Sequence, residues 1–235
     1  MKFGVIGEHL KHSFSKEIHE KIADYSYVVK EIEPDNLGTF LTEAEFCGIN
    51  VTIPYKEKVI PYLYSISDTA RKIGAINTVV NKDGKLYGYN TDYMGMRSLI
   101  LRNGIDLKGK KALILGTGGA SKAVYHGLLS LGVEPTFVSR TPSKGQLSYA
   151  QLTPEVMAEY TIIVNTTPLG MYPKVEECPD IPYELLTPNH LLYDLLYNPD
   201  ETLFMRRGKE HGAVVKNGLE MLLLQAFAAW DIWNS

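Results

Sequence analysis

Residues Lys110-Lys-Ala-Leu-Ile-Leu-Gly-Thr-Gly-Gly-Ala-Ser-Lys122 decide the fold of the second half of the chain. The apolar run 112–115 predicts a buried strand, which a glycine loop joins to a helix that begins near Gly119. Gly116 allows a tight turn, and Gly118 lets the backbone approach a phosphate group closely. The start of the helix directs unpaired N–H groups at an anion. This pattern indicates a pyrophosphate site of a dinucleotide at Gly116, Gly118 and the helix start near Gly119.

A glycine loop alone is weak evidence, and Ser121 stands where a third glycine is usual. About 20 residues further on, the chain has Ser139-Arg140-Thr141, with Lys144 close behind. An NAD site has Asp or Glu at that position to hold the ribose 2′-hydroxyl, and a carboxylate there would repel a 2′-phosphate. Arg140 therefore favours NADP over NAD as the cofactor. The alternative is a solvated Arg140 in an ordinary strand-to-helix loop.

Length and composition exclude several classes of protein. The chain has 235 residues and a net charge of -3, so it is long enough for one large or two small α/β domains. Without a basic cluster, neither nucleic acid nor an anionic membrane surface is expected as a partner. No apolar run is long enough for a membrane span, and the N-terminus is typical of a first strand rather than a signal peptide, so we expect a cytoplasmic protein. The cysteines and histidines show no metal-binding spacing, and no metal is expected.

The first half of the chain alternates between strands and helices. We expect strands at about 2–6, 26–32 and 48–53, and helices at about 15–24 and 35–43. Pro54 fits the first turn of a short helix that runs to about Tyr64. Asp68 can cap a helix that stops at Gly74, and Asp83-Gly84 predicts a hairpin between 75–81 and 85–90. Thr91 or Asp92 begins a further helix, which ends at Asn103-Gly104.

After residue 110 the α/β pattern begins again, which predicts two α/β domains. The expected boundaries are 1–93, completed by a C-terminal helix at 218–235, and 94–217. Further buried strands are expected at 161–165, 190–195 and 213–216, and 141–149 is expected to be a loop. The final helix is apolar on nearly all sides, so it must be covered on most of them and is expected to pack back across the junction of the two domains.

Polar side chains follow the strands of the first half. In open α/β sheets, ligands bind at the carboxyl ends of the strands, where residues distant in sequence can converge. Lys56 comes shortly after the strand at 48–53, and Asp92 follows another strand directly. A lysine ammonium near a carboxylate can deliver a proton to a carbonyl oxygen as hydride arrives, as ketone reduction requires. Alternatively, Lys56 is a solvated helix lysine, Asp92 is a helix cap, and Ser13 and Ser15 are caps as well.

Eight motifs in order resemble the shikimate dehydrogenase family and cover nearly the whole chain. They are His12-Ser-Phe-Ser15, Asn50-Val-Thr-Ile-Pro-Tyr-Lys56, Gly74-Ala-Ile-Asn-Thr78, Gly88-Tyr-Asn-Thr-Asp92, Gly116-Thr-Gly-Gly-Ala-Ser121, Asn165-Thr-Thr-Pro-Leu-Gly-Met171, Tyr193-Asp-Leu-Leu-Tyr197 and Asn217-Gly-Leu-Glu-Met-Leu-Leu-Leu-Gln225. An ordered set of this kind is far more specific than any one of its members.

The resemblance implies an N-terminal substrate-binding domain with a mostly parallel sheet and a Rossmann-like NADP-binding domain. It implies Lys56 and Asp92 as the catalytic pair. It also implies that a shikimate-like acid is bound by Ser13, Ser15, Thr52, Lys56, Asn77, Asp92, Tyr197 and Gln225. For the cofactor, it implies that the pyrophosphate is bound by Gly116, Gly118, Gly119, Ala120 and Ser121. It also implies Asp68 at the cleft, the 2′-phosphate near Ser139, Arg140, Thr141 and Lys144, and the nicotinamide along Leu195 and Gly218.

The chain departs from the family pattern at several positions. Lys16 replaces the usual proline after the second serine, Ser139 replaces the common asparagine, and Lys144 replaces a second arginine. Lysine offers a point charge where arginine offers a fork, so the 2′-phosphate is expected to be held less tightly. The chain is also shorter than usual after Thr141 and after the final helix, which bears on NADP affinity and on contacts between subunits.

The function that the resemblance implies is NADP-dependent reduction of 3-dehydroshikimate to shikimate in aromatic amino-acid biosynthesis. One alternative is a related enzyme that acts on quinate or another cyclic hydroxy acid. Another is a non-catalytic nucleotide-binding or sensing protein with the same fold. Retention of both Lys56 and Asp92 argues against the sensor, because binding alone needs no proton relay. The sequence leaves open the choice between shikimate and quinate and the choice between a monomer and a homodimer.

Overall fold

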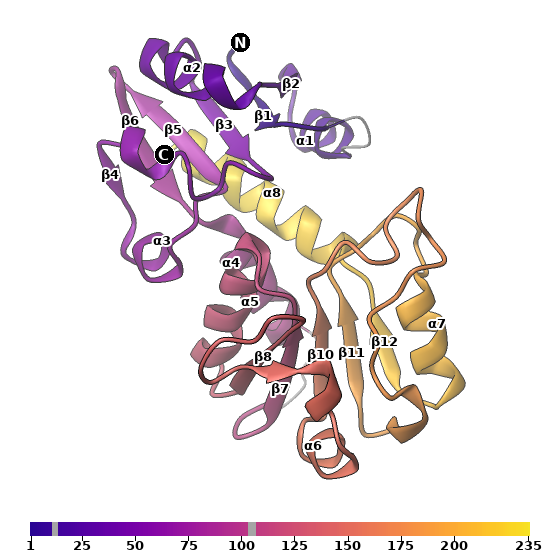
Figure 1. The fold of residues 1–235 in the computed structure, drawn as a ribbon. Helices are drawn as coiled ribbons and strands as arrows, with labels where there is room; N and C mark the ends of the chain where they lie inside the picture. The colour runs from indigo at the N-terminus through magenta and orange to yellow at the C-terminus, as the bar shows by residue number, and fades with distance from the viewer. Residues whose placement is uncertain (11–13, 103–106) are drawn as a thin grey trace. The chain divides into compact units, whose positions relative to one another are not determined.

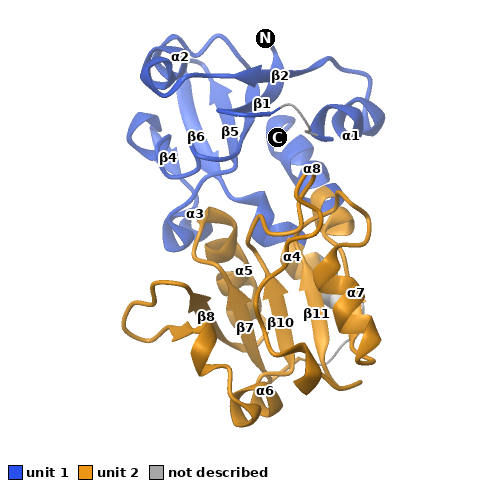
Figure 2. Ribbon diagram, turned by 45° about the vertical axis from the view of Figure 1, so that its right-hand side comes forward, with its two compact units in different colours: residues 1–95, 223–235 blue, residues 96–222 orange. Residues whose placement is uncertain are grey.

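The computed structural model describes residues 1–10, 14–102 and 107–235 (Figure 1). The chain divides into two compact units, which Figure 2 separates by colour. The first unit contains Met1–Gly95 and Leu223–Ser235, and the second contains Met96–Leu222. Each unit has its own six-stranded sheet, so the prediction of a two-domain α/β protein is confirmed.

The sheet of the first unit has the strand order β2-β1-β3-β5-β6-β4. Its strands are β1 (Phe3–Gly7), β2 (Tyr27–Glu31), β3 (Gly48–Val51), β4 (Ser65–Ile66), β5 (Thr78–Lys82) and β6 (Lys85–Tyr89). β1 pairs in parallel with β2 and β3, and β4 pairs in parallel with β6. β5 runs antiparallel to both of its neighbours, β3 and β6, because it forms a hairpin with β6 around Asp83-Gly84. The predicted hairpin is therefore present.

Helices of the first unit follow its early strands as predicted. They are α1 (Ser15–Ile22), α2 (Leu37–Glu43), which a short 3-10 helix η1 (Pro34–Asn36) precedes, and α3 (Asp68–Ile73). α3 ends at Gly74, which adopts a left-handed conformation with φ of 71°, as its glycine predicted. The predicted cap at the other end was wrong. Ser67 has the extended backbone of a cap residue, and its hydroxyl accepts a hydrogen bond from Ala70 N, so Asp68 lies in the first turn.

The helix predicted from Pro54 to about Tyr64 is absent. Turns occupy residues 53–59, and only a 3-10 helix, η2 (Ile60–Tyr62), follows. Two constraints prevent an α-helix here. The Lys56 carbonyl accepts a hydrogen bond from Ile76 N at 2.7 Å, and Pro61 has no N–H to donate inside a helix.

The C-terminal helix α8 (Leu219–Trp233) is fixed to the first sheet by its last aromatic residue. Trp233 stacks on Phe3 of β1, and its Nε1 donates a hydrogen bond to the Val79 carbonyl of β5 at 3.1 Å. A Cβ atom at Gly48 of β3 would lie 2.5 Å from the indole. The indole therefore needs a glycine beneath it, and it touches three neighbouring strands.

α8 is less covered than its composition predicted. Leu219, Leu223 and Phe227 are 42%, 37% and 51% exposed, and they recur every four residues along one side of the helix. The expectation that the helix is covered on most sides is therefore only partly met. The buried side carries Gln225, Ala226 and Ala229.

The sheet of the second unit is parallel throughout, with the order β12-β11-β10-β7-β8-β9. Its strands are β7 (Lys111–Leu115), β8 (Glu134–Ser139), β9 (Leu147–Ser148), β10 (Ile162–Asn165), β11 (Leu191–Asp194) and β12 (Val214–Lys216). From β7, strands β8 and β9 extend the sheet in one direction, and strands β10, β11 and β12 extend it in the other. This is the doubly wound order of dinucleotide-binding folds, with the switch point between β7 and β10.

Helices α5 (Gly119–Ser130), α6 (Pro154–Glu159) and α7 (Leu203–Glu210) connect these strands, together with the 3-10 helices η3 (Tyr149–Gln151) and η4 (Tyr183–Leu185). Helix α4 (Thr91–Arg102) follows β6 and precedes β7 in the chain. The loop predicted over 141–149 is present up to residue 146, after which β9 adds two residues to the edge of the sheet. The predicted end of α4 at Asn103-Gly104 lies outside the described residues.

Replacing Trp233 by alanine should destabilise the first unit by about 3–5 kcal/mol, the usual cost of removing a large buried aromatic side chain. Urea unfolding followed by far-UV circular dichroism would measure the loss. Phe227→Ala is the matched control on the same helix, and because Phe227 is half exposed it should cost about 0.5 kcal/mol or less. Equal losses in the two variants would show that Trp233 does not anchor the helix.

Candidate functional site

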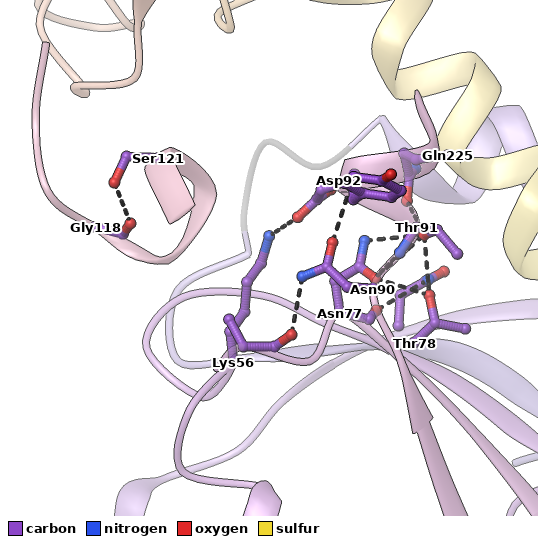
Figure 3. Close-up of polar contacts among 12 residues, drawn as sticks. Lys56, Asn77, Thr78, Asn90, Thr91, Asp92, Gly118, Ser121 and Gln225 are labelled. Carbon is purple, nitrogen blue, oxygen red and sulfur yellow. Dashed lines mark hydrogen bonds and ion pairs between the residues drawn. The ribbon is translucent and has the colours of Figure 1, made fainter. Parts of the chain in front are cut away.

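Lys56 and Asp92 form an ion pair in the first unit (Figure 3). Lys56 Nζ lies 2.5 Å from Asp92 Oδ2, and the two side chains are 15% and 13% exposed. Lys56 lies in the turn that follows β3, and Asp92 lies in the first turn of α4. Both side chains are therefore partly withdrawn from solvent but still reachable, which excludes the alternative of a freely solvated Lys56.

The backbone around each partner explains why they meet. The bond from Ile76 N to the Lys56 carbonyl ties the turn after β3 to the segment that leads into β5. At the other partner, Asn90 Oδ1 accepts a hydrogen bond from Tyr93 N at 3.0 Å and so caps α4. The alternative in which Asp92 caps this helix is therefore excluded, and its carboxylate is available to Lys56.

A buried polar network lies directly beside the pair. Asn77 Oδ1 accepts a hydrogen bond from Thr91 N at 2.7 Å, and Asn77 Nδ2 donates to the Thr91 hydroxyl at 3.0 Å. The Thr91 hydroxyl lies 3.0 Å from that of Thr78 and 3.4 Å from Gln225 Oε1 (Figure 3). Gln225, from α8, is thus bonded to the residue that precedes Asp92. The network brings together two of the predicted substrate residues, Asn77 and Gln225.

A second layer lies behind this network. Asn50 Nδ2 donates to the Asn77 carbonyl and to the Thr78 hydroxyl, both at 3.2 Å, and Asn50 Oδ1 accepts from the Tyr27 hydroxyl at 2.7 Å. The Tyr27 ring stacks on His19 of α1 with 4.2 Å between ring centroids. Burial lowers the pKa of His19 to about 4, so the imidazole is neutral at ordinary pH.

The remaining predicted substrate residues have different surroundings. Ser13 lies outside the described residues. Ser15 is the first residue of α1, preceded by Phe14 at the cap position, so it is not the cap. Thr52 directly follows β3 and donates its N–H to the Ile6 carbonyl of β1 at 3.0 Å. Tyr197 belongs to the second unit, in the loop after β11.

The arrangement suits a polyhydroxylated ligand with a reactive oxygen. Hydroxyl and amide groups can donate and accept, so they match hydroxyl groups without adding charge. An ammonium group held by a carboxylate can donate a proton to a carbonyl oxygen and accept it back. The first unit therefore combines neutral recognition groups with one group competent in proton transfer.

The second unit has the features of an anion site at its switch point. α5 begins at Gly119, and its cap residue, Gly118, provides no side-chain hydrogen bond to the first turn. A Cβ atom on Gly118 would meet no heavy atom within 4 Å, so the protein's own packing does not require glycine there. Gly116 is different, because its φ of 102° requires glycine, and a Cβ atom there would also lie tightly against the Thr166 hydroxyl, at 3.0 Å. These residues fit the pyrophosphate of NADP.

Ser121 occupies the third-glycine position without obstructing the loop. Its side chain is buried, and its hydroxyl donates to the Gly118 carbonyl at 2.6 Å. Ala120 precedes it in the first turn of α5. The hydroxyl is thus turned back onto the loop, which explains how serine replaces glycine here.

The residues predicted to bind the 2′-phosphate follow β8, which neighbours β7. Ser139 ends that strand, and its hydroxyl accepts a hydrogen bond from Thr141 N at 3.2 Å. Arg140, Thr141 and Lys144 are exposed in the loop. The two cations thus lie at the carboxyl end of the second strand of the unit, where the ribose binds in dinucleotide folds.

The other predicted cofactor residues lie in both units. Asp68 is exposed in the first turn of α3, in the first unit. Leu195 and Gly218 belong to the second unit and approach each other closely, because a Cβ atom on Gly218 would lie 2.0 Å from the Leu195 carbonyl oxygen. Glycine is therefore the residue that this contact allows.

Thr91 and Asn50 lie in the family motifs, but the sequence did not indicate that they, together with Tyr27, connect the predicted residues. Thr78 pairs with Tyr89 across the hairpin, so strand register could have placed Thr91 beside Asn77 and Thr78. Tyr27 had no comparable signal, because its contact with Asn50 depends on the packing of β2 against its neighbours.

The described residues contain neither a membrane-spanning helix nor a cluster of metal ligands. No helix there is both long and apolar enough to span a membrane. Within the same ranges, no three His, Cys, Asp or Glu side chains come together as metal ligands would.

Comparisons with known proteins agree with one another. The model of the shikimate dehydrogenase substrate binding domain matches residues 5–79. Shikimate dehydrogenase (NADP(+)) from Clostridium beijerinckii is 41% identical over 250 residues, covering 99% of this chain and 91% of that protein.

Solved structures extend the similarity to the whole fold. Shikimate dehydrogenase 1 from Peptoclostridium difficile is 38% identical with a TM-score of 0.88, covering 100% of this chain and 92% of that one. Shikimate 5-dehydrogenase from Thermus thermophilus, solved in complex with NADP(H) and shikimate, is 33% identical with a TM-score of 0.88, covering 99% of this chain and 93% of that one. The chain belongs to the shikimate dehydrogenase family.

Proposed function

We propose that this protein is an NADP-dependent shikimate dehydrogenase that reversibly reduces 3-dehydroshikimate to shikimate. The observation that carries the proposal is the Lys56–Asp92 ion pair, which a family member needs for chemistry and a non-catalytic sensor does not. Its pathway is aromatic amino-acid biosynthesis by way of chorismate. The enzyme acts in the cytoplasm, as a monomer or a homodimer, without a nucleic-acid partner.

The catalytic roles follow from the chemistry of the pair. NADPH, when bound, supplies the hydride that reduces the C3 carbonyl. Lys56 holds a proton at Nζ and donates it to the carbonyl oxygen, and in the reverse direction it accepts the proton of the C3 hydroxyl. Asp92 orients the ammonium group and accepts a hydrogen bond from a substrate hydroxyl.

In the proposed assignment, residues 1–93 with 218–235 form the substrate-binding domain, and residues 94–217 form the NADP-binding domain and supply Tyr197 to the substrate. Neutral groups bind the hydroxyls and the carboxylate of the substrate: Ser13, Ser15, Thr52, Asn77, Tyr197 and Gln225. An analogue that lacks one substrate hydroxyl would lose the hydrogen bond made by that hydroxyl, which penalises its binding. Gly116–Ser121 bind the pyrophosphate, Ser139–Lys144 surround the 2′-phosphate, Leu195 and Gly218 border the nicotinamide, and Asp68 lies near the cofactor.

Steady-state rates with two substrates and two cofactors test the proposed function directly. The purified protein should oxidise shikimate with NADP, and it should do so with a higher kcat/KM than for quinate or for NAD. Initial rates of NADPH or NADH formation at 340 nm would be measured for the four combinations. A protein that turns over quinate but not shikimate, or neither, would contradict the proposal.

Replacing Lys56 by alanine should lower kcat for shikimate by roughly 10²–10⁴-fold, because the proton donor is removed, while KM changes much less. Lys58→Ala is the matched control two residues away, because Lys58 is exposed and lies over the Tyr55 ring rather than beside Asp92. A folded Lys56→Ala protein with normal turnover would remove the catalytic assignment even though the family membership stands.

Replacing Arg140 by alanine should reduce kcat/KM for NADP by roughly 10- to 100-fold and leave that for NAD nearly unchanged, because a charge-assisted contact with the 2′-phosphate is lost. The preference of the unmodified protein should be moderate, since Lys144 and Ser139 are weaker partners than the usual residues. Arg206→Ala, an exposed arginine of α7, controls for the change in net charge. Equal kcat/KM for both cofactors in the unmodified protein would contradict the role of Arg140.

A further inference from the structure

A buried carboxylate of the second unit, Asp194, has no role in the proposed chemistry. Asp194 is the last residue of β11, and it pairs in register with Asn165, the last residue of β10. Both residues are fully buried. Two polar side chains thus end adjacent parallel strands at the edge where ligands bind in such sheets.

Three neutral donors hold the carboxylate. Asp194 Oδ1 accepts hydrogen bonds from Asn165 Nδ2 and Leu196 N, both at 3.0 Å, and Oδ2 accepts from the Thr202 hydroxyl at 2.6 Å. Burial raises the pKa of Asp194 to about 6, and the three hydrogen bonds oppose this rise. A buried carboxylate costs free energy unless its donors are fixed, so these three hydrogen bonds tie the donor segments firmly to Asp194.

The segment that Asp194 closes is the loop 195–202. Leu195 N donates to the Asn165 carbonyl at 3.0 Å, and the Leu196 carbonyl accepts from Gly218 N at 2.9 Å. The Thr202 hydroxyl also caps α7, because it accepts a hydrogen bond from Met205 N. One carboxylate therefore connects the end of β11, the Leu195–Leu196 backbone and the start of α7.

The topology indicates which half of a dinucleotide this loop faces. The pyrophosphate site follows β7 at the switch point, and Arg140 follows β8 on one side of it. The two mononucleotide halves of such a fold lie on opposite sides of the switch point, so the nicotinamide half falls on the side of β10 and β11. The close contact between Leu195 and Gly218 lies on that side.

We infer that Asp194 is a positioning residue for the nicotinamide half of the cofactor: with Asn165 and Thr202 it fixes the Leu195–Leu196 backbone against Gly218. The inference rests on the proposed NADP-dependent function. Asp194 acts through the loop and does not contact the reacting atoms. Its loss should weaken binding of the nicotinamide half and leave the adenosine half, on the side of Arg140, unaffected.

Binding of two ligands, one with the nicotinamide and one without it, tests whether Asp194 affects only the nicotinamide half. The dissociation constants of NADPH and of 2′-phospho-ADP-ribose, which lacks the nicotinamide, would be measured by fluorescence titration and calorimetry. Asp194→Ala should weaken NADPH about 10-fold or more, because donors that converged on a buried charge lose their acceptor, and should change 2′-phospho-ADP-ribose less than about 2-fold. Asp194→Asn keeps one acceptor oxygen, so its affinity for NADPH should lie between those of the unmodified protein and Asp194→Ala. Asp180→Ala, an exposed aspartate of the same unit, is the control.

The measured affinities distinguish a failure of the Asp194 positioning role from a failure of the NADP-dependent function. Unchanged NADPH affinity in Asp194→Ala, or equal loss for both ligands, would overturn the positioning role. If Asp194→Ala does not fold, Asp194→Asn is judged by the same ratio of affinities, and Thr202→Val should shift that ratio in the same direction while Thr202→Ser restores it. Failure of the unmodified protein to bind NADPH at all would instead contradict the proposed function.

Discussion

The ion pair between Lys56 and Asp92 is the interaction on which the site of the first unit depends. It requires two segments to be fixed to each other: the turn after β3 and the start of α4. Ile76 N donates a hydrogen bond to the Lys56 carbonyl, which fixes the turn after β3. Asn77 Oδ1 accepts a hydrogen bond from Thr91 N, which fixes the start of α4. Since Ile76 and Asn77 are neighbours in one short segment, a shift of that segment would move both partners together, and the pair would keep its geometry.

Glycines and buried polar groups position the backbone in both units. Gly48 gives room to the Trp233 indole, which secures the helix that carries Gln225. Gly218 gives room to the Leu195 carbonyl, and Asp194 holds the loop on the other side of that contact. The first of these contacts joins the end of the chain to the central strands β1, β3 and β5 of the first sheet, and the second joins the segments that follow β11 and β12. Packing between residues separated in sequence therefore positions the backbone in both units.

The sequence predicted the regular elements well where local signals were strong. The glycine loop after β7, the hairpin at Asp83-Gly84 and the end of α3 at Gly74 each have a residue whose backbone preference determines the structure. The false helix after Pro54 shows the limit, because the Lys56 carbonyl is bound by Ile76 from a distant segment. Likewise, Lys56 and Asp92 were recognisable from the family motifs, but Tyr27 behind Asn50 was not, because no local pattern encodes a contact between separate strands.

A kinetic double-mutant cycle on Lys56 and Asp92 would show whether the two residues act as one catalytic unit. The kcat for shikimate oxidation at saturating NADP would be measured for Lys56→Ala, Asp92→Ala and the double variant, with circular dichroism to verify that each is folded. If the two residues act as one proton-transfer unit, the double variant should be little slower than the slower single variant. If the two losses instead multiply, Lys56 and Asp92 act independently, and the account of the ion pair as the catalytic unit is contradicted.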